Sequence, residues 1–189
     1  MHMKHFSIEQ NIVLAVLSVL ICFNLNATNY YVDDNSSTGD VFCLNANGDD
    51  ANDGLDADNP KLTFSNLIAT YGAALTSGDT IFIDAGVYNG EEGYTLPASK
   101  FGITFIGAGY DKTIFDNQLA GAATDYFMYI MASNTTFENL SFTGYENNGT
   151  QTPGHSGQAI TVGGNSGSPV TNVLFENVSF YNNGASGGN

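Results

Sequence analysis

An acidic loop in the first third of the chain carries the side chains best suited to holding a metal ion. The run NANGDDANDGLDADNP supplies carboxylates of the kind that Ca²⁺ binds in sets of about six to eight oxygens. The candidate ligands are Asp49, Asp50, Asp53, Asp56 and Asp58. Their spacing does not complete an EF-hand, because Ala51 stands where an oxygen is needed. The run therefore predicts a Ca²⁺ site, with a plain acidic, turn-rich loop as the alternative.

Two glutamates could serve glycosidic chemistry, which commonly uses a pair of carboxyl groups. Glu138 and Glu176 occupy equivalent positions in two copies of a repeated phrase. On neighbouring parallel strands their positions would lie about 4.8 Å apart, which is closer than a separate acid and base usually stand. We therefore expect a solvated or cation-screened pair and no catalytic role.

The remaining candidates are single residues without partners of the right type. His155 lies in the loop PGHSG with no second His, Cys or patterned carboxylate nearby, so we interpret it as a solvated loop histidine. Lys112 is the best-placed catalytic base, yet its phrase GAGYDKT is typical of a structural turn. The chain has no Arg, so a uronate carboxylate would find no bidentate partner. We expect no catalytic residue and no organic cofactor in this chain.

A repeated phrase indicates which elements position these residues. Residues 135–142 read TTFENLSF, and residues 173–180 read VLFENVSF, 38 positions later. A related strand, GITFIG, places Phe105 32 positions before Phe137. Each copy is too short to bury its own apolar face, and repetition at this period is typical of solenoids, in which copies stack on one another.

Alternation within the repeat predicts the orientation of its side chains. The apolar residues of the two copies should point inward: Phe137, Leu140, Phe142, Phe175, Val178 and Phe180. Glu138 and Ser141 should point outward. Asn139 and Asn177 interrupt the alternation, and Asn tolerates the left-handed backbone conformation that a corner needs. The pattern favours an all-β coil with corners, a parallel β-helix, over a flat sheet.

The N-terminal segment is typical of a secretory signal peptide covering residues 1–27. The apolar run Ile12–Phe23 is followed by Ala27, a small residue at the cleavage position, and an uncleaved anchor is the alternative. Cleavage would leave Cys43 as the single cysteine, which we expect to pack in the cap as a small apolar residue.

Two further regions are expected after the signal. Residues 28–78 should form a cap that contains the acidic loop and an amphipathic helix at Phe64–Leu75, with Thr63 as the N-cap. Such a helix would cover the open end of the first coil. Residues 79–189 should form the coils. They stop at NNGASGGN without a closing element, so we expect the coils to be truncated at their C-terminal end.

The phrases of the coils also carry a family resemblance. GDTIFIDAGVY, GITFIGAGYDKTIFD and the repeated F-E-N-[LV]-S-F resemble the start of the right-handed parallel β-helix proteins of the pectin-lyase-like superfamily. The preceding YYVDDNSSTGDVFC and GDDANDGLDADNPKLTFSNLIATY are similar to the cap region of large secreted β-helix proteins of Bacteroidetes-type bacteria. The resemblance, over about residues 29–183, implies a right-handed parallel β-helix with a short capping helix. It leaves function open, since lyases, hydrolases and adhesins share such coils.

Composition narrows the class of partner. The formal net charge of −15 with four lysines argues against nucleic acid or an acidic membrane surface. We expect a secreted or cell-surface scaffold or adhesin-like module, monomeric, that binds a polysaccharide or surface glycan through corner loops such as Tyr145–Gln158. The alternative is the front part of a polysaccharide lyase or glycoside hydrolase whose catalytic residues lie beyond Asn189.

Overall fold

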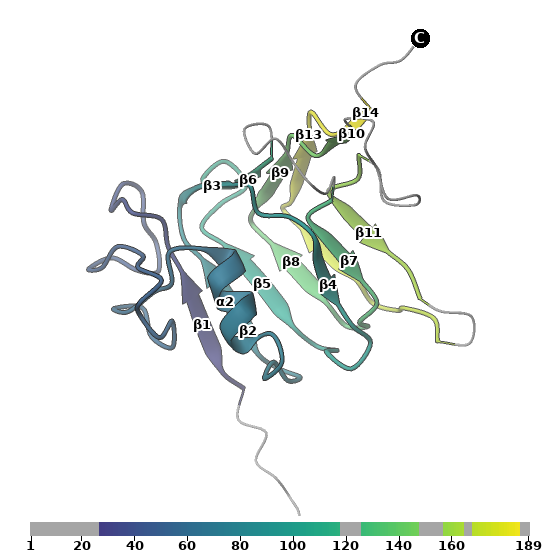
Figure 1. Ribbon diagram of the computed structural model, residues 1–189, viewed down its shortest axis with the longest axis horizontal. Coiled ribbons are helices and arrows are strands. Elements are labelled where there is room, and N and C mark those ends of the chain that lie inside the picture. The colour runs from purple at the N-terminus through teal and green to yellow at the C-terminus, as the bar shows by residue number, and fades with distance from the viewer. Residues whose placement is uncertain (1–26, 118–125, 148–156, 165–167, 186–189) are drawn as a thin grey trace, which may run out of the picture.

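The computed structural model describes residues 27–117, 126–147, 157–164 and 168–185 (Figure 1). His155, most of the corner loop at 145–158 and the signal segment up to residue 26 lie outside the described residues. What the sequence predicts for these segments therefore stays a prediction.

Within the described ranges, strands form three larger sheets and one two-stranded pair (Figure 1). The first sheet has the order β1 (Asn29–Val32), β2 (Thr80–Ile83), β5 (Thr104–Gly107), β8 (Thr136–Glu138) and β12 (Leu174–Glu176). The second has β3 (Gly86–Asn89), β6 (Thr113–Asp116), β9 (Ser141–Thr143) and β13 (Ser179–Tyr181). The third has β4 (Tyr94–Leu96), β7 (Met128–Ile130) and β11 (Ile160–Val162). The pair is β10 (Glu146–Asn147) with β14 (Gly184–Ala185).

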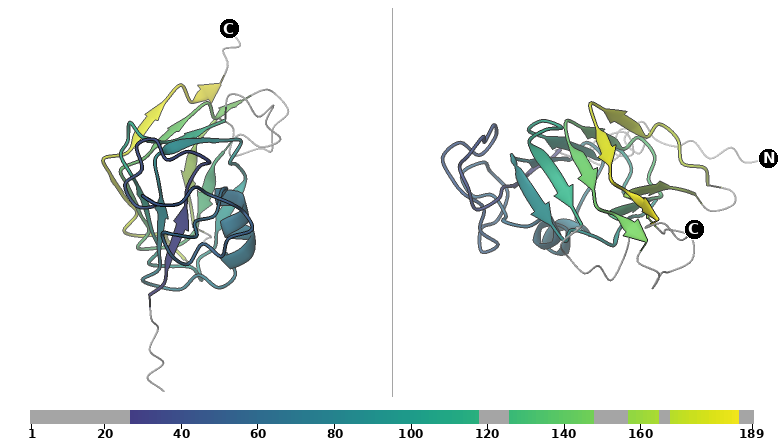
Figure 2. Two further views of the ribbon diagram at one scale, coloured as in Figure 1. Left: turned by 90° about the vertical axis from the view of Figure 1, so that its left-hand side faces the viewer. Right: turned by 90° about the horizontal axis from the view of Figure 1, so that it is seen from above.

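The chain visits the three larger sheets in rotation. β2, β3 and β4 belong to the first, second and third sheets, and β5, β6 and β7 repeat that order. Each pairing between strands is parallel, so neighbouring strands of a sheet run the same way (Figure 2, right). The predicted all-β class with parallel, stacked sheets is confirmed at this level, and the arrangement is compatible with a parallel β-helix.

The register between strands follows the repeated phrases. Phe137 on β8 pairs with Phe105 on β5 and with Phe175 on β12, as the offsets of 32 and 38 residues predict. The ring centroids lie 4.6 Å and 5.3 Å apart, with nearly parallel planes. A second column places Phe142 between Phe115 and Phe180, at 5.5 Å and 5.3 Å. The alignment read from the sequence is thus confirmed as physical stacking.

Burial confirms the inward orientation for the first copy of the phrase and limits it for the second. Phe137, Leu140 and Phe142 are at most 1% exposed. Phe175 and Phe180 are 37% and 47% exposed, because each stacks on one coil only among the described residues. The outward prediction for Ser141 is wrong as regards exposure: its hydroxyl donates to the backbone carbonyl of Tyr110, and the residue is buried.

A single helix in the described ranges, α2 (Phe64–Tyr71), packs against the interior of the first coils. The Thr63 side chain accepts a hydrogen bond from the backbone N–H of Asn66, which confirms Thr63 as the N-cap. The helix is shorter than predicted: it ends at Tyr71, and Gly72, a poor helix former, is the C-cap. No helix in these ranges has the length and hydropathy needed to span a membrane.

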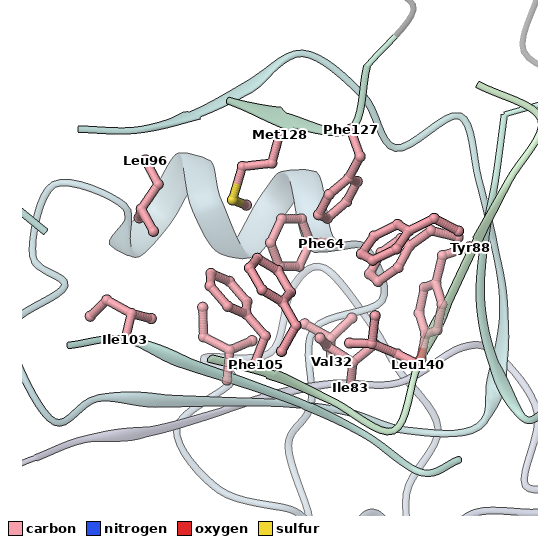
Figure 3. Packing of buried hydrophobic residues seen from close by; sticks show 14 of the residues in the cluster. Val32, Phe64, Ile83, Tyr88, Leu96, Ile103, Phe105, Phe127, Met128 and Leu140 are labelled. Atoms are coloured by element: carbon pink, nitrogen blue, oxygen red, sulfur yellow. The ribbon is translucent and has the colours of Figure 1, made fainter. Parts of the chain in front are cut away.

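Phe64 joins the helix to the aromatic core. Its ring centroid lies 6.1 Å from that of Phe105 and 5.3 Å from that of Phe127, and Figure 3 shows it projecting between them. Phe64 and Leu67 lie on one face of the helix, and both are 0% exposed. The helix therefore covers core surface that the first strands would otherwise expose, while its role as a cap stays a prediction.

Residues 33–59 form turns and bends without helix or strand, and this stretch includes most of the acidic run read as a turn-rich loop (Figure 1). The loop returns to the free side of β1. There the N–H of Tyr31 donates to the carbonyl of Gly54, and the N–H of Lys61 donates to the carbonyl of Tyr31, both at 2.9 Å. These bonds pair the backbone of an edge strand that would otherwise be exposed.

Candidate metal centre

The acidic loop holds its aspartates with local hydrogen bonds rather than around a common centre. Oδ1 of Asp50 accepts from the two backbone N–H groups that precede α2, at 3.1 Å and 3.0 Å. Asp49, Asp53 and Asp56 each accept from the N–H two residues further on, as in Asx turns. Each of these carboxylates therefore has a structural partner in the loop or just after it.

The five aspartates predicted to bind Ca²⁺ do not converge. In the described part of the chain, no three of Asp49, Asp50, Asp53, Asp56 and Asp58 bring carboxylate oxygens within 4.8 Å of one another. Asp58 is exposed to solvent. Calcium binding by these five residues stays a prediction that the geometry of the loop does not favour.

A different set of carboxylates does converge, where the acidic loop meets the first two strands. Asp33 directly follows β1, and Asp84 directly follows β2. Since Val32 pairs with Ile83 in the parallel register, the next residues along the strands, Asp33 and Asp84, fall side by side. Asp40 reaches the same place from the loop. The three residues bring one carboxylate oxygen each within 4.8 Å of one another.

Two of these carboxylates are buried without a hydrogen-bond donor. Asp33 is 0% exposed, and neither of its side-chain oxygens has a hydrogen-bond partner. Both oxygens of Asp40, and Oδ1 of the neighbouring Asp34, are also buried and have no hydrogen-bond partner. Five donor-less carboxylate oxygens in one place are unfavourable, because buried charges require pairing, hydrogen bonds or a metal ion.

Asp84 differs from its neighbours because its carboxylate is fully hydrogen-bonded. Its two oxygens accept from four backbone N–H groups, those of Val41 (2.7 Å), Phe42 (2.7 Å), Cys43 (2.5 Å) and Ala85 (2.8 Å). Four bonds fill the acceptor capacity of a carboxylate. Asp84 therefore ties the loop to the end of β2 and holds Asp40 beside Asp33.

Burial and mutual repulsion raise the pKa values of the unpartnered acids. Burial raises the pKa of Asp33 to about 8, and the carboxylate of Asp40 adds to the shift. The carboxylates of Asp84 and Asp34 raise the pKa of Asp33 further, whereas the polar backbone of Asp34 lowers it. Burial likewise raises the pKa of Asp34 and that of Asp40. Without a cation, Asp33 therefore holds its proton to a higher pH than an exposed aspartate does.

Cys43 and Tyr88 lie beside the cluster and stay neutral. Burial raises the pKa of the Cys43 thiol and that of the Tyr88 phenol, and the negative charges of Asp33 and Asp84 raise both further. The Tyr88 hydroxyl donates to the backbone carbonyl of Asp84 at 3.1 Å. Cys43 is free and 1% exposed, in agreement with the prediction that it packs as a small apolar residue. The centre therefore offers carboxylate oxygens rather than a thiolate, which suits a hard cation.

Glu138, Glu176 and Lys112, the other candidates from the sequence, lie on paired strands or in a turn. Glu138 and Glu176 are register partners on β8 and β12, as the repeat predicts. Lys112 is exposed, and its backbone builds a turn: its N–H donates to the carbonyl of Gly109, and its carbonyl accepts from the N–H of Gly86, both at 2.9 Å. These contacts agree with the interpretation of GAGYDKT as a turn.

The sequence did contain a signal for the cluster at Asp33 and Asp84. The segments NYYVD and TIFID each place an Asp directly after a short strand, and parallel pairing of the two strands brings these aspartates together. The prediction of a cap at residues 28–78 and coils from residue 79 hides this signal, because it places Asp33 and Asp84 in different regions.

Comparison of the chain with models of protein families, with curated proteins and with solved structures found no match.

Proposed function

We propose that this chain is the capped end of a right-handed parallel β-helix of the pectin-lyase-like type, exported from the cell as a scaffold or adhesin-like module. The observation that carries the proposal is the column of Phe105, Phe137 and Phe175, in which like residues stack from coil to coil at 4.6 Å and 5.3 Å. The rotation of the chain through three parallel sheets supports it as well. Both features are typical of solenoids.

The repeated residues serve contacts between coils, so a partner would meet the turns and outward faces. Phe101 and Tyr110 lie outside the strands and are 50% and 51% exposed. Aromatic rings on turns offer flat apolar surface with little conformational entropy to lose, which suits the apolar face of a sugar ring. Because the net charge is −15, a neutral polysaccharide is a better partner than a polyanion.

Affinity electrophoresis of the full chain through gels that contain neutral polysaccharides tests the binding. We expect retarded migration in at least one neutral polymer, reduced in Tyr110→Ala. Val87→Ala, which truncates an exposed apolar residue on β3, is the matched control and should migrate like the parent chain. Unretarded migration in every polymer would remove the glycan from the proposal.

The same polymers, incubated with the chain and assayed for unsaturated uronides and new reducing ends, separate the scaffold from the alternative. The scaffold proposal expects no product. Product release that grows with protein concentration would favour a polysaccharide lyase or glycoside hydrolase instead.

A further inference from the structure

We propose that Asp33 and Asp40, with Asp34 beside them, form a calcium site that fastens the cap to the first coil. Asp33 ends the strand β1, and Asp40 lies in the loop that Asp84 holds against the end of β2. An ion shared by Asp33 and Asp40 would therefore connect the loop with the first sheet. This site is independent of glycan binding, and its test does not require a glycan.

The irregular loop around these carboxylates suits calcium better than magnesium. Oxygens on opposite sides of Ca²⁺ lie about 4.6–5.2 Å apart, because each bond is about 2.3–2.6 Å long. For Mg²⁺ the corresponding separation is about 4.0–4.2 Å. One carboxylate oxygen each of Asp33, Asp40 and Asp84 lies within 4.8 Å of the other two, a limit that accommodates either ion. Ca²⁺ is the better match because it tolerates irregular coordination, whereas Mg²⁺ demands near-ideal octahedral geometry that an irregular loop seldom supplies.

The state of Asp33 is the observation that separates this cluster from an ordinary acidic surface patch. A solvated aspartate needs no other partner, but Asp33 is 0% exposed and has no donor for either oxygen. Its neighbour Asp40 is in the same condition. One cation would satisfy these oxygens together and cancel the repulsion among them. The rival is a proton shared between the two carboxyl groups, which would leave no need for a metal.

The surroundings leave room for a third carboxylate. A Cβ atom added at Gly86 would lie 2.8–2.9 Å from the carboxylate of Asp34, so the glycine lets Asp34 lie against the start of β3. Asp84 adds negative charge nearby while its own oxygens stay bonded to backbone N–H groups. Asp84 is thus a positioning residue, the unpartnered oxygens of Asp33 and Asp40 are the ligands, and Oδ1 of Asp34 adds a further unpartnered oxygen nearby.

Thermal unfolding of the full chain, freed of metal with a chelator and then given Ca²⁺, Mg²⁺ or NaCl at matched ionic strength, tests the site. We expect Ca²⁺ at millimolar concentration to raise the midpoint by several degrees and clearly more than Mg²⁺. Calorimetric titration should give a stoichiometry near one Ca²⁺ per chain. Equal shifts with all three salts would mean screening or a shared proton, and would overturn the proposal.

Asn substitutions locate the ion. In chelator, Asp33→Asn should unfold at the same temperature as the parent chain or higher, because a buried acid is replaced by a neutral group, yet it should lose the Ca²⁺ shift. Asp40→Asn should lose the Ca²⁺ shift too. If Asp33→Asn does not fold, Asp40→Asn tests the site in its place. Asp56→Asn, in the exposed part of the acidic loop, is the matched control and should keep the shift. A Ca²⁺ shift that survives in Asp33→Asn or disappears in Asp56→Asn would overturn the assignment.

Discussion

The side chain of Asn177 donates from Nδ2 to Oδ1 of Asn139 across a distance of 2.7 Å. Both residues adopt the left-handed backbone conformation, with φ of 53° and 57°. Asn172 and Asn134 repeat the same contact at 2.9 Å and the same backbone sign. One residue type thus turns the chain next to a strand and bonds to its equivalent 38 residues away, which links the local backbone to the pairing of neighbouring strands.

Asn139→Ala should destabilise the chain more than Asn139→Gly. Alanine in the left-handed conformation costs about 1–2 kcal/mol, whereas glycine adopts it freely, and both variants lose the side-chain bond to Asn177. Urea unfolding at fixed pH and calcium concentration measures the difference. Equal losses for the two variants would show that the corner does not depend on its positive φ.

Phe137→Ala should cost far more than Phe175→Ala. Phe137 is 1% exposed between two rings, so its truncation should lower the free energy of unfolding by about 3–5 kcal/mol. Phe175 is 37% exposed and stacks on one coil, so less apolar area returns to water and the loss should stay below about 2 kcal/mol. Denaturant unfolding compares the two. A larger loss for Phe175→Ala than for Phe137→Ala would contradict the assignment of Phe137 to the buried face of β8.

Glu91 anchors the start of α2, and its truncation should be costly. The residue is 4% exposed, Oε1 accepts from the Phe64 N–H at 2.9 Å, and Oε2 accepts from the Tyr94 hydroxyl. Glu91→Ala leaves the buried Phe64 N–H without a partner and removes the acceptor of the partly exposed Tyr94 hydroxyl, which should cost about 2 kcal/mol in unfolding free energy. Glu176→Ala, at an exposed position on β12, is the matched control. Similar losses for the two would mean that the contact at α2 contributes little.

In the metal-free chain, Asp33 should make stability fall as pH rises between about 4 and 8. Its pKa is raised from 3.8 to about 8, so in this window the folded chain holds a proton that the unfolded chain has released. The contribution is complete below the lower value and is lost as pH rises through the higher one, with a slope of up to about 1.4 kcal/mol per pH unit. Urea unfolding in chelator across this range should give a steeper decline for the parent chain than for Asp33→Asn. Parallel profiles would show that Asp33 titrates normally.

The repetitive part of the fold could be predicted because its information is local and repeated. FENLSF and FENVSF fix the strand register, since each Phe pairs with the equivalent Phe 38 positions away. Thr63 ahead of an apolar stripe fixes the start of α2. Asn139 and Asn177 indicate the turns by residue type alone, and both have a positive φ. In each case the deciding interaction lies within a few residues or in a copy of the same phrase.

The candidate site could not be read in this way because it depends on contacts between unlike segments. Asp40 reaches Asp33 only because Asp84, more than 40 residues later, bonds to the N–H groups of residues 41–43. Composition pointed to the densest run of aspartates, whose carboxylates form local turns. A contact with a distant segment likewise explains why Ser141 is buried: its hydroxyl donates to the backbone carbonyl of Tyr110.

Diffraction from a crystal of the full chain grown with Ca²⁺, recorded at a wavelength where calcium scatters anomalously, tests the metal centre most directly. The account predicts an anomalous peak about 2.3–2.6 Å from carboxylate oxygens of both Asp33 and Asp40. A peak among Asp49, Asp53 and Asp56 with none at Asp33, or no peak beside either group, would contradict it.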